Sequence, residues 1–411
     1  MSEIYVVGVG MTAFGKFPDK SVKELTKEAV TAAMADAGCK VADIQAVWFA
    51  NTAQGANEGQ YTVRGQMALR PMGFEGIPIF NVENACASAS TAFNLACAHL
   101  RAGLSNVVLA VGADKMFFPD KEKAFRVFLG GMDVYSTEET FTLLLALGEG
   151  ITPPKEASHK DGIKSVFMDV YAALARFHMK AFGTTQRQLA VVASKNHFHS
   201  TMNPLSQYQK DFTVEEVLNA RIVSWPLTLP MCSPVSDGAA AAVLCNGETL
   251  GRFDRSRAVK LYASVVGSSV DRTPEEVERH SCHLAAMKAY DQAGLGPEDM
   301  SVAEVHDATS FAEIQQSENL GFCEFGQGGS LAETGETRLG GRIPINVSGG
   351  LVSKGHPVGA TGLGQIHELV VQLRGEAGAR QVEGARFAVA ENGGGFYGIE
   401  EAAVAVTILG R

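Results

Sequence analysis

The stretch NVENACASAS at residues 81–90 decides how the chain is interpreted, because it joins an apolar run to a long helical pattern. The apolar run at residues 77–82 predicts a buried strand, and the helical pattern continues through residues 95–100. Cys86 therefore lies at a predicted helix N-terminus, where unpaired N–H groups and the helix dipole favour the thiolate over the thiol. The pattern predicts a nucleophilic cysteine, although a small buried cysteine would fit it as well.

Length and charge limit the class of protein. With 411 residues and 46% hydrophobic content, the chain can bury a large core, and it is expected to form two or three domains or one duplicated architecture. The net charge of −10, without a basic cluster, argues against nucleic acid or an anionic membrane as a partner. A polyanionic cofactor would need a local positive pocket.

The spacing of the cysteines and the first residues of the sequence bear on the cellular compartment expected for the protein. Seven scattered cysteines without a CxxC pair indicate neither a disulfide framework nor a structural zinc site. The sequence begins directly with a strand-like run at residues 4–9, and no apolar run reaches membrane-spanning length. These features predict a cytoplasmic protein in a reducing compartment.

Strands and helices alternate over residues 1–114, which predicts a mostly parallel sheet with both faces covered. Gly8, Gly10 and Ala13 match a loose dinucleotide-binding pattern. A dinucleotide loop must open directly into a helix, whereas the first helix here is expected only from Ser21. The pattern therefore favours an ordinary buried strand.

The alternation stops between residues 115 and 224, and this stretch is interpreted as a helical insertion that binds or covers something. Helices are predicted over residues 166–182 and 186–196. His197 and His199 could suit a metal on a strand, but at a helix end they are expected to cap it or face solvent.

A second half begins near residue 259 and repeats the order of the first, which indicates an internal duplication of about 150 residues. Its predicted strands cover residues 259–266, 302–305, 343–347, 387–390 and 402–409, and its predicted helices cover residues 274–293, 311–320 and 361–373.

Three motifs follow predicted strands of the second half, where α/β folds place their chemistry. They are VHDATSF at residues 305–311, SGGLVSKGHPVGATG at residues 348–362 and AENGGG at residues 390–395. His356 lies between Gly355 and Pro357, so its backbone has little freedom and placement of the ring is the expected purpose.

Taken together, these motifs resemble those of a thiolase over nearly the whole chain. The motifs are NACAS at 84–88, SDGAA at 236–240, HDA at 306–308, GHPVGATG at 355–362 and GGG at 393–395. The chain is most similar to the sterol-carrier-protein-type and archaeal branch, because His306 and Asp307 stand where better-known thiolases have an Asn-Glu pair.

The resemblance implies an α/β thiolase fold, with duplicated halves in a five-layer αβαβα arrangement and an inserted helical loop domain. The implied N-terminal half covers residues 1–114 and 225–257. The implied loop domain, which binds CoA and substrate, covers residues 115–224, and the C-terminal half covers residues 258–411.

The resemblance also implies thiolytic cleavage of a 3-ketoacyl-CoA, or the reverse Claisen condensation, through an acyl thioester on Cys86. His356 would take the thiol proton and, with His306, form a hole for the thioester oxygen. The backbone of Cys86 and of the triplet Gly393, Gly394 and Gly395 would form a second oxyanion hole. Ser233 and Met168 would contact the pantetheine arm of CoA.

One position departs from the family pattern. Thiolases carry an acid/base cysteine before the glycine triplet, and this chain has Glu391 there. A carboxylate in a dry pocket can act as a base with a raised pKa, so Glu391 is predicted to be the acid/base. It could equally be a structural acceptor, or mark a retro-aldolase acting on side chains of CoA esters. A non-catalytic scaffold is the other alternative, but it would predict loss of Cys86 or His356.

The expected ligands and partners also follow from the resemblance. CoA is a substrate, and neither a tightly bound cofactor nor a metal is expected. A homodimer is implied, as is a small zinc-ribbon and OB-fold partner subunit.

Overall fold

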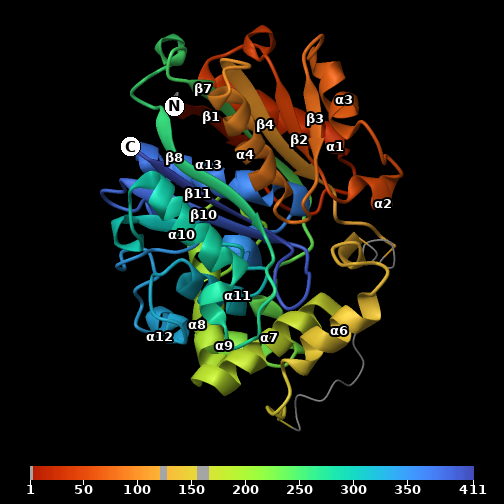
Figure 1. Ribbon diagram of the computed structural model, residues 1–411, viewed down its shortest axis with the longest axis vertical. Helices are drawn as coiled ribbons and strands as arrows, with labels where there is room; N and C mark the ends of the chain where they lie inside the picture. The colour runs from red at the N-terminus through yellow and green to blue at the C-terminus, as the bar shows by residue number, and fades with distance from the viewer. Residues whose placement is uncertain (1–2, 121–126, 155–165) are drawn as a thin grey trace.

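The computed structural model describes residues 3–120, 127–154 and 166–411, and its architecture is a mixed α/β fold (Figure 1). Within these residues a nine-stranded sheet has the order β3-β2-β4-β7-β1-β8-β11-β10-β9, and β5 and β6 form a separate pair. The strands are β1 (Ile4–Met11), β2 (Val47–Ala50), β3 (Ile79–Val82), β4 (Val107–Asp114), β5 (Ile222–Ser224), β6 (Leu227–Thr228), β7 (Gly238–Asn246), β8 (Val259–Ser268), β9 (Val302–Glu304), β10 (Phe387–Gly394) and β11 (Ala403–Gly410).

The long sheet consists of two halves that meet through a short pairing of β1 with β8, at Tyr5 with Lys260 and Val6 with Val259. Helices α4 (Ser88–Arg101) and α13 (Thr361–Arg374) fill the space between the halves with one apolar core. The outer face of the first half is covered by α1 (Val22–Ala37) and α3 (Arg64–Leu69), and that of the second half by α10 (Ser281–Ala293). The result is five layers in the order αβαβα.

The prediction of a mostly parallel sheet was wrong. Strand β2 is parallel to β3 and β4, and β10 is parallel to β9, but the remaining pairs of the long sheet are antiparallel. One reason is that β7, which comes after the insertion, enters between β1 and β4 and runs antiparallel to both. Strand β11 is likewise antiparallel to both of its neighbours, β8 and β10. The alternation of strands and helices in the sequence does not reveal the late insertion of β7.

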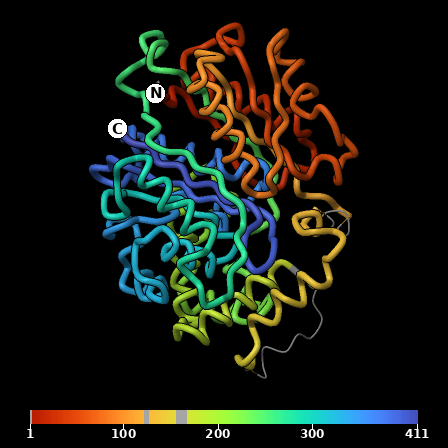
Figure 2. The backbone as a smooth tube through the Cα atoms, viewed as in Figure 1, coloured from red at the N-terminus to blue at the C-terminus, as the bar shows by residue number. Residues whose placement is uncertain are grey.

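Helices of residues 115–224 form a separate layer below the second half, drawn yellow to green in Figure 2. They are α6 (Thr137–Ala146), α7 (Val166–Phe182), α8 (Gln186–Ser200) and α9 (Val214–Leu218). Their apolar side chains share a core with α11 (Ser310–Asn319), so the insertion packs directly on the residues that follow β9. The predicted helical insertion also includes residues 121–126 and 155–165, which lie outside the described residues.

Gly8 and Gly10 are explained by packing. A Cβ on Gly8 would lie 2.4 Å from the backbone oxygen of Ala33, and one on Gly10 would lie 2.3 Å from its backbone nitrogen. Helix α1 therefore crosses β1 at a distance that only glycine permits. This helix begins after Ser21, whose hydroxyl and the Glu24 carboxylate form a capping box.

Two predicted elements of the second half differ from those observed. The helix predicted over residues 274–293 begins only at Ser281, because residues 277–279 form a 3₁₀ turn. Instead of a strand over residues 343–347 there is an isolated bridge between Ala303 and Ile345, because Asn346 has a left-handed φ of 54°.

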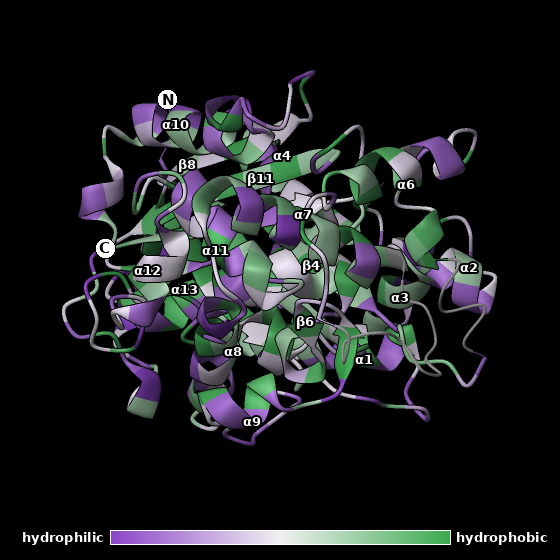
Figure 3. Cartoon of the chain, turned by 90° about the horizontal axis from the view of Figure 1, so that it is seen from below, coloured by the Kyte–Doolittle hydropathy of each residue, from purple (hydrophilic) through white to green (hydrophobic). Residues whose placement is uncertain are grey.

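The remaining short helices are α2 (Gln54–Glu58) and α12 (Gly328–Glu333). Figure 3 shows hydrophilic residues on the outer helices and loops of the fold. Among the described residues, no helix combines the length and the apolar character needed to cross a membrane.

Candidate active site

Cys86 lies between β3 and α4, where the sequence places it. Ala85 has a φ of 48°, and its N–H donates to the Glu83 carboxylate at 2.6 Å, which fixes the turn before the helix. Burial raises the pKa of the Cys86 thiol to about 12, as do the nearby carboxylates of Asp114 and Glu83. Backbone N–H groups of Cys86 and Gly395 oppose this rise in pKa but do not overcome it. The prediction that the helix N-terminus favours a thiolate was therefore wrong for the unliganded protein, and the thiol needs a base.

His356 follows Gly355, whose φ of 115° turns the chain sharply. The His356 N–H donates to the Ser236 hydroxyl at 2.9 Å, and Nδ1 lies 2.7 Å from Oγ1 of Thr361. Because the Thr361 hydroxyl itself donates to the oxygen of Pro357, it must accept from Nδ1–H. Burial, with a smaller effect of His306, holds the pKa of His356 well below its usual value. The ring is neutral and its Nε2 carries a free lone pair.

His306 lies just after β9. Neither of its ring nitrogens has a hydrogen-bond partner within the described residues, although the residue is only 2% exposed. Burial lowers the pKa of His306 to about 4. A buried ring with two unpaired nitrogens is costly, so this histidine is set up to bind something that the polypeptide does not supply.

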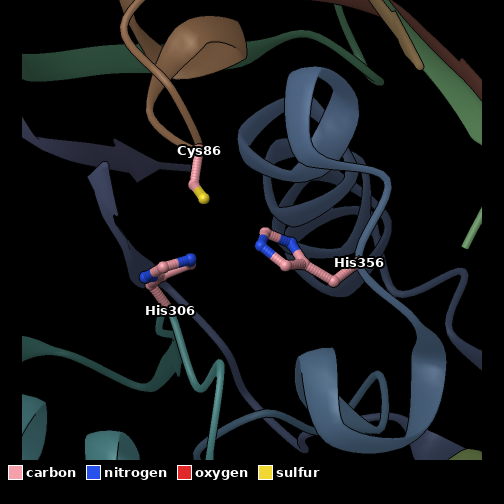
Figure 4. A group of neighbouring side chains, drawn as sticks. All are labelled: Cys86, His306 and His356. Atoms are coloured by element: carbon pink, nitrogen blue, oxygen red, sulfur yellow. The ribbon is translucent and has the colours of Figure 1, made fainter. Parts of the chain in front are cut away.

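These three side chains converge, as Figure 4 shows. The Cys86 sulfur and a ring nitrogen from each of His306 and His356 lie within 4.8 Å of one another, and the two rings are 5.2 Å apart at 63°. The three atoms could also hold one soft divalent ion. The expectation of no metal site stays a prediction.

The converging groups form part of the wall of a cavity of about 310 Å³. Ser233 and Met168, predicted from the resemblance to contact pantetheine, are also lining residues. The wall is mostly apolar and aromatic, with Phe128, Phe167 and Phe396 among its members. A second space of about 300 Å³ also borders Cys86 and shares Phe128, Phe167 and Gly395 with the first. The cavity suits a long ligand that is apolar over much of its length.

The glycine triplet closes the cavity near Cys86. A Cβ on Gly394 would lie 2.7 Å from the backbone nitrogen of Ala87, and one on Gly395 would lie 2.8 Å from the oxygen of Gly131. Gly394 and Gly395 line the cavity. A Cβ on Gly393 would instead lie 2.7 Å from Cγ of Glu401, so this glycine makes room for that side chain.

Glu391 is fully buried on β10 but is not one of the described residues that line this cavity. One carboxylate oxygen accepts the backbone N–H of His306 at 3.0 Å, and the other is unpaired among the described residues. Burial raises the pKa of Glu391 to about 8. The carboxylate supports the backbone of His306, and its predicted acid/base role stays a prediction.

Sequence reasoning missed three polar residues of the cavity wall, which are Tyr171 on α7, Arg221 just before β5 and Glu401 before β11. It also missed that Thr361 sets the tautomer of His356. For Thr361 a signal was present, because it lies one turn after His356 in the same motif. Glu401 gave no signal, since it is one of two adjacent glutamates in a loop.

His197 and His199 were expected to cap a helix or face solvent, and this was wrong. Each is 1% exposed. His197 contacts the oxygen of Pro230 and the Ser353 hydroxyl, and His199 contacts the oxygen of Asn346 and the N–H of Leu339. All four ring nitrogens are paired, because α8 packs against the loops of the second half.

Comparisons with known proteins agree with this geometry. The family model "Thiolase, N-terminal domain" matches residues 4–216, and "Thiolase C-terminal domain-like" matches residues 263–411. An acetyl-CoA acetyltransferase of Methanothermobacter thermautotrophicus is 37% identical over 96% of this chain and 97% of its own length. Sterol carrier protein 2 of Gallus gallus is 38% identical over 95% of this chain and 69% of its own. The benzoylsuccinyl-CoA thiolase subunit BbsB of Thauera aromatica is 31% identical over 93% and 91%, respectively.

Solved structures share the fold. One described as an Ltp2-ChsH2(DUF35) aldolase has a TM-score of 0.76 at 24% identity and covers 99% of this chain and 97% of its own. Human mitochondrial 3-ketoacyl-CoA thiolase in complex with CoA has a TM-score of 0.67 at 16% identity, covering 100% and 98%. The expected fold class and branch are confirmed. The chain belongs to the thiolase family and is an acyltransferase that uses CoA esters.

Proposed function

We propose that this protein cleaves a 3-ketoacyl-CoA with free CoA, or runs the reverse Claisen condensation, through an acyl thioester on Cys86. The observation that carries the proposal is the convergence of the Cys86 sulfur with ring nitrogens of His306 and His356 within 4.8 Å. A thiol, a free imidazole lone pair and a second unpaired imidazole are the groups that acyl transfer to sulfur requires.

The neutral ring of His356 is the base for Cys86. Its Nε2 lone pair is free because Nδ1–H donates to Thr361. The thiol stays protonated until a substrate carbonyl arrives, since its pKa is about 12. Proton transfer to Nε2 as the carbon–sulfur bond forms avoids a free thiolate in a buried site.

Each carbonyl oxygen that gains negative charge during the reaction needs hydrogen-bond donors. His306, whose ring nitrogens are unpaired, donates one hydrogen bond to the thioester oxygen of the CoA substrate. The backbone N–H groups of Cys86 and Gly395, which point at the sulfur, serve the oxygen of the acyl group on Cys86. Gly394 and Gly395 let this backbone approach, whereas Gly393 makes room for Glu401.

Residues 115–224 are proposed to be the loop domain that holds CoA, between an N-terminal half at 1–114 with 225–257 and a C-terminal half at 258–411. Met168 on α7 and Ser233 after the insertion line the same cavity, which supports a pantetheine site there. No adenine or phosphate site is assigned.

We also propose that the protein works as a homodimer with a small second subunit. One relative is described as a subunit and one structure as a complex with a DUF35 protein, and both facts belong to those proteins. After co-expression with a DUF35 protein, light scattering should give a mass greater than that of the homodimer alone. A dimer that is fully active alone would contradict the need for a partner.

The acyl enzyme is the test of the reaction. The intact mass of the wild-type protein is measured after incubation with acetyl-CoA, acetoacetyl-CoA, succinyl-CoA and benzoyl-CoA, beside Cys86→Ser. We expect an acyl adduct in the wild type that is absent in Cys86→Ser, and its mass identifies the acyl group. Cleavage of a CoA ester to a ketone or aldehyde without an adduct would favour the retro-aldolase. Neither adduct nor cleavage, alone or with the partner, would favour a scaffold.

A further inference from the structure

The carboxylate of Glu401 belongs to the wall of the catalytic cavity. Glu401 is 5% exposed and lines the cavity together with Cys86, His306 and His356. Room for its side chain exists because residue 393 is glycine. Glu391, by contrast, directs one oxygen to the backbone of His306 and does not line this cavity.

The Glu401 carboxylate is oriented by a buried histidine. Oε2 of Glu401 lies 3.4 Å from Nε2 of His280, the residue that precedes α10. The N–H of Cys282 donates to Nδ1 of the same ring at 3.2 Å, so the neutral ring carries its proton on Nε2, the nitrogen that lies against Glu401. Burial lowers the pKa of His280 to about 3, so the ring is neutral at physiological pH. The side-chain amide of Gln316 donates to Oε1 of Glu401 at 3.3 Å.

The charged groups around Glu401 leave it able to change protonation. Arg272 is paired with Glu400 rather than with Glu401. Burial raises the pKa of Glu401 to about 7, with a further rise from Glu400 and an opposing effect of Arg272. Glu391 lies near enough to Glu401 for the Glu401 carboxylate to raise the pKa of Glu391. Tyr171 on α7 lies near enough to Glu401, Glu391 and Cys86 for all three groups to raise its own pKa. An acid/base works best when its pKa is near the working pH.

We propose that Glu401, positioned by His280, is the carboxylate that moves the proton at the α-carbon of the CoA ester. The assignment rests on the proposed thiolase reaction. It places the second proton transfer inside the cavity, where the departing carbon is, and gives it to a residue that the family motifs do not mark.

The step balances in the thiolytic direction. The Cys86 sulfur bonds to the 3-keto carbon, the C2–C3 bond breaks, and its electron pair stays on C2 of the departing CoA ester. Protonated Glu401 gives its proton to C2. The thiol of incoming CoA then loses its proton to the Glu401 carboxylate as its sulfur bonds to the acyl carbon. The Cys86 sulfur leaves and takes back the proton held by His356.

Hydrogen exchange at the α-carbon isolates this step from acylation. Acetyl-CoA, succinyl-CoA and propionyl-CoA are incubated with the protein in D₂O, and deuterium in the ester is followed by mass spectrometry, beside the adduct on Cys86. For Glu401→Gln we expect α-exchange to fall by about 10² to 10⁴ fold. The adduct should still form in Glu401→Gln, because Cys86 and His356 are intact, although more slowly, since the departing CoA sulfur no longer receives the proton of Glu401.

Matched variants separate the alternatives. Glu391→Gln, Tyr171→Phe and Cys282→Ser change other ionisable groups near Glu401. Exchange lost in any of them but retained in Glu401→Gln would overturn the assignment. In Glu401→Ala, added formate should restore part of the exchange, which a purely structural role would not allow. Unchanged exchange in Glu401→Gln also overturns the proposal.

The wild type alone provides a test that does not depend on a variant folding. Exchange should rise with pH through about pH 7 as Glu401 loses its proton, whereas a rate that is flat from about pH 5.5 to about pH 8.5 would overturn the inference. His306 and His356 do not explain such a rise, because burial holds their pKa values at about 4 and well below the usual value, respectively. Glu391 also titrates in this range, because burial raises its pKa to about 8, so the profile is measured in Glu391→Gln as well, and loss of the rise in that variant would overturn the inference. An absent adduct in the wild type would defeat the proposed function itself, and that result is distinct from lost exchange with the adduct still formed.

Discussion

Two pairs of buried histidines in this protein differ in one property. His197 and His199 on α8 have every ring nitrogen paired with a polar group of the polypeptide. His306 has neither nitrogen paired within the described residues, and His356 has only Nδ1 paired there, with the hydroxyl of Thr361. Burial is nearly the same in both pairs. The difference teaches that a ring nitrogen without a hydrogen-bond partner, and not burial, distinguishes a reactive histidine from a structural one.

The largest effect is expected at His356. Replacing it with Asn removes the free Nε2 lone pair, and turnover should fall by about 10² to 10⁴ fold, because the Cys86 thiol then has no neighbouring base. Steady-state rates with the CoA ester that forms the adduct, and the rate of adduct formation, measure the change. Equal rates of adduct formation in His356→Asn and wild type would remove the distinction between the two pairs.

At His306 a smaller loss is expected. His306→Ala removes a donor to the oxygen that gains charge, and turnover should fall by about 10² to 10³ fold. The protein should unfold no more easily than wild type, since no hydrogen bond to the ring is lost within the described residues. Urea unfolding beside the kinetic assay checks both parts. A strongly destabilised His306→Ala protein would contradict the view that its nitrogens await a ligand.

Thr361 tests the difference between the two histidine pairs more finely, because its hydroxyl determines which ring nitrogen of His356 carries the unshared lone pair. Thr361→Val removes the acceptor for Nδ1–H, and we expect turnover to fall by about tenfold. Thr361→Ser keeps the hydroxyl and is the matched control, with turnover expected near that of wild type. Kinetic assays of both variants, with melting curves to confirm folding, test this positioning role. An equal loss in Thr361→Ser, which keeps the hydroxyl, would contradict the assignment of the effect to the hydroxyl of Thr361.

His199 represents the other pair, and its effect should appear in stability alone. Burial lowers the pKa of His199 to about 3, below the value of about 6.5 in the unfolded chain. The unfolded state therefore binds more protons over this window, and the stability due to the neutral ring is present above about pH 6.5 and is lost as pH falls towards about 3.

His199→Gln tests that linkage. Its free energy of unfolding should depend less steeply on pH, by about 1.4 kcal/mol per pH unit within the window. Urea titrations at about pH 6, 5 and 4 measure the slope, and turnover at neutral pH should stay near wild type. A slope equal to that of wild type would show that the ring is protonated in the folded state.

Local patterns predicted many elements well. Helix α7 has the predicted bounds, and α1 begins after Ser21, where the first helix was expected. The motifs at Cys86, His306 and His356 each follow a strand or a sharp turn, so the position of each one in its half of the fold could be predicted from the sequence. Residues close in the chain determine caps, turns and amphipathic faces, and these signals need no knowledge of the fold.

Long-range pairing was the part that could not be predicted. Strand β7 reaches the first half of the sheet from beyond the insertion, and the antiparallel contacts it makes are not encoded in its own small residues. The burial of His197 depends on which loops pack against α8. Glu401 enters the cavity only because β10 and β11 pair and residue 393 is glycine.

The sequence by itself determined the family and predicted Cys86, His306 and His356 as site residues, because their motifs are local and occur in a fixed order. Only the tertiary structure decided the charge state of Cys86, since burial and the carboxylates of Asp114 and Glu83 outweigh the helix N-terminus. It also decided which carboxylate lines the cavity. Desolvation and proximity are sums over groups distant in the chain, and no local stretch of sequence contains them.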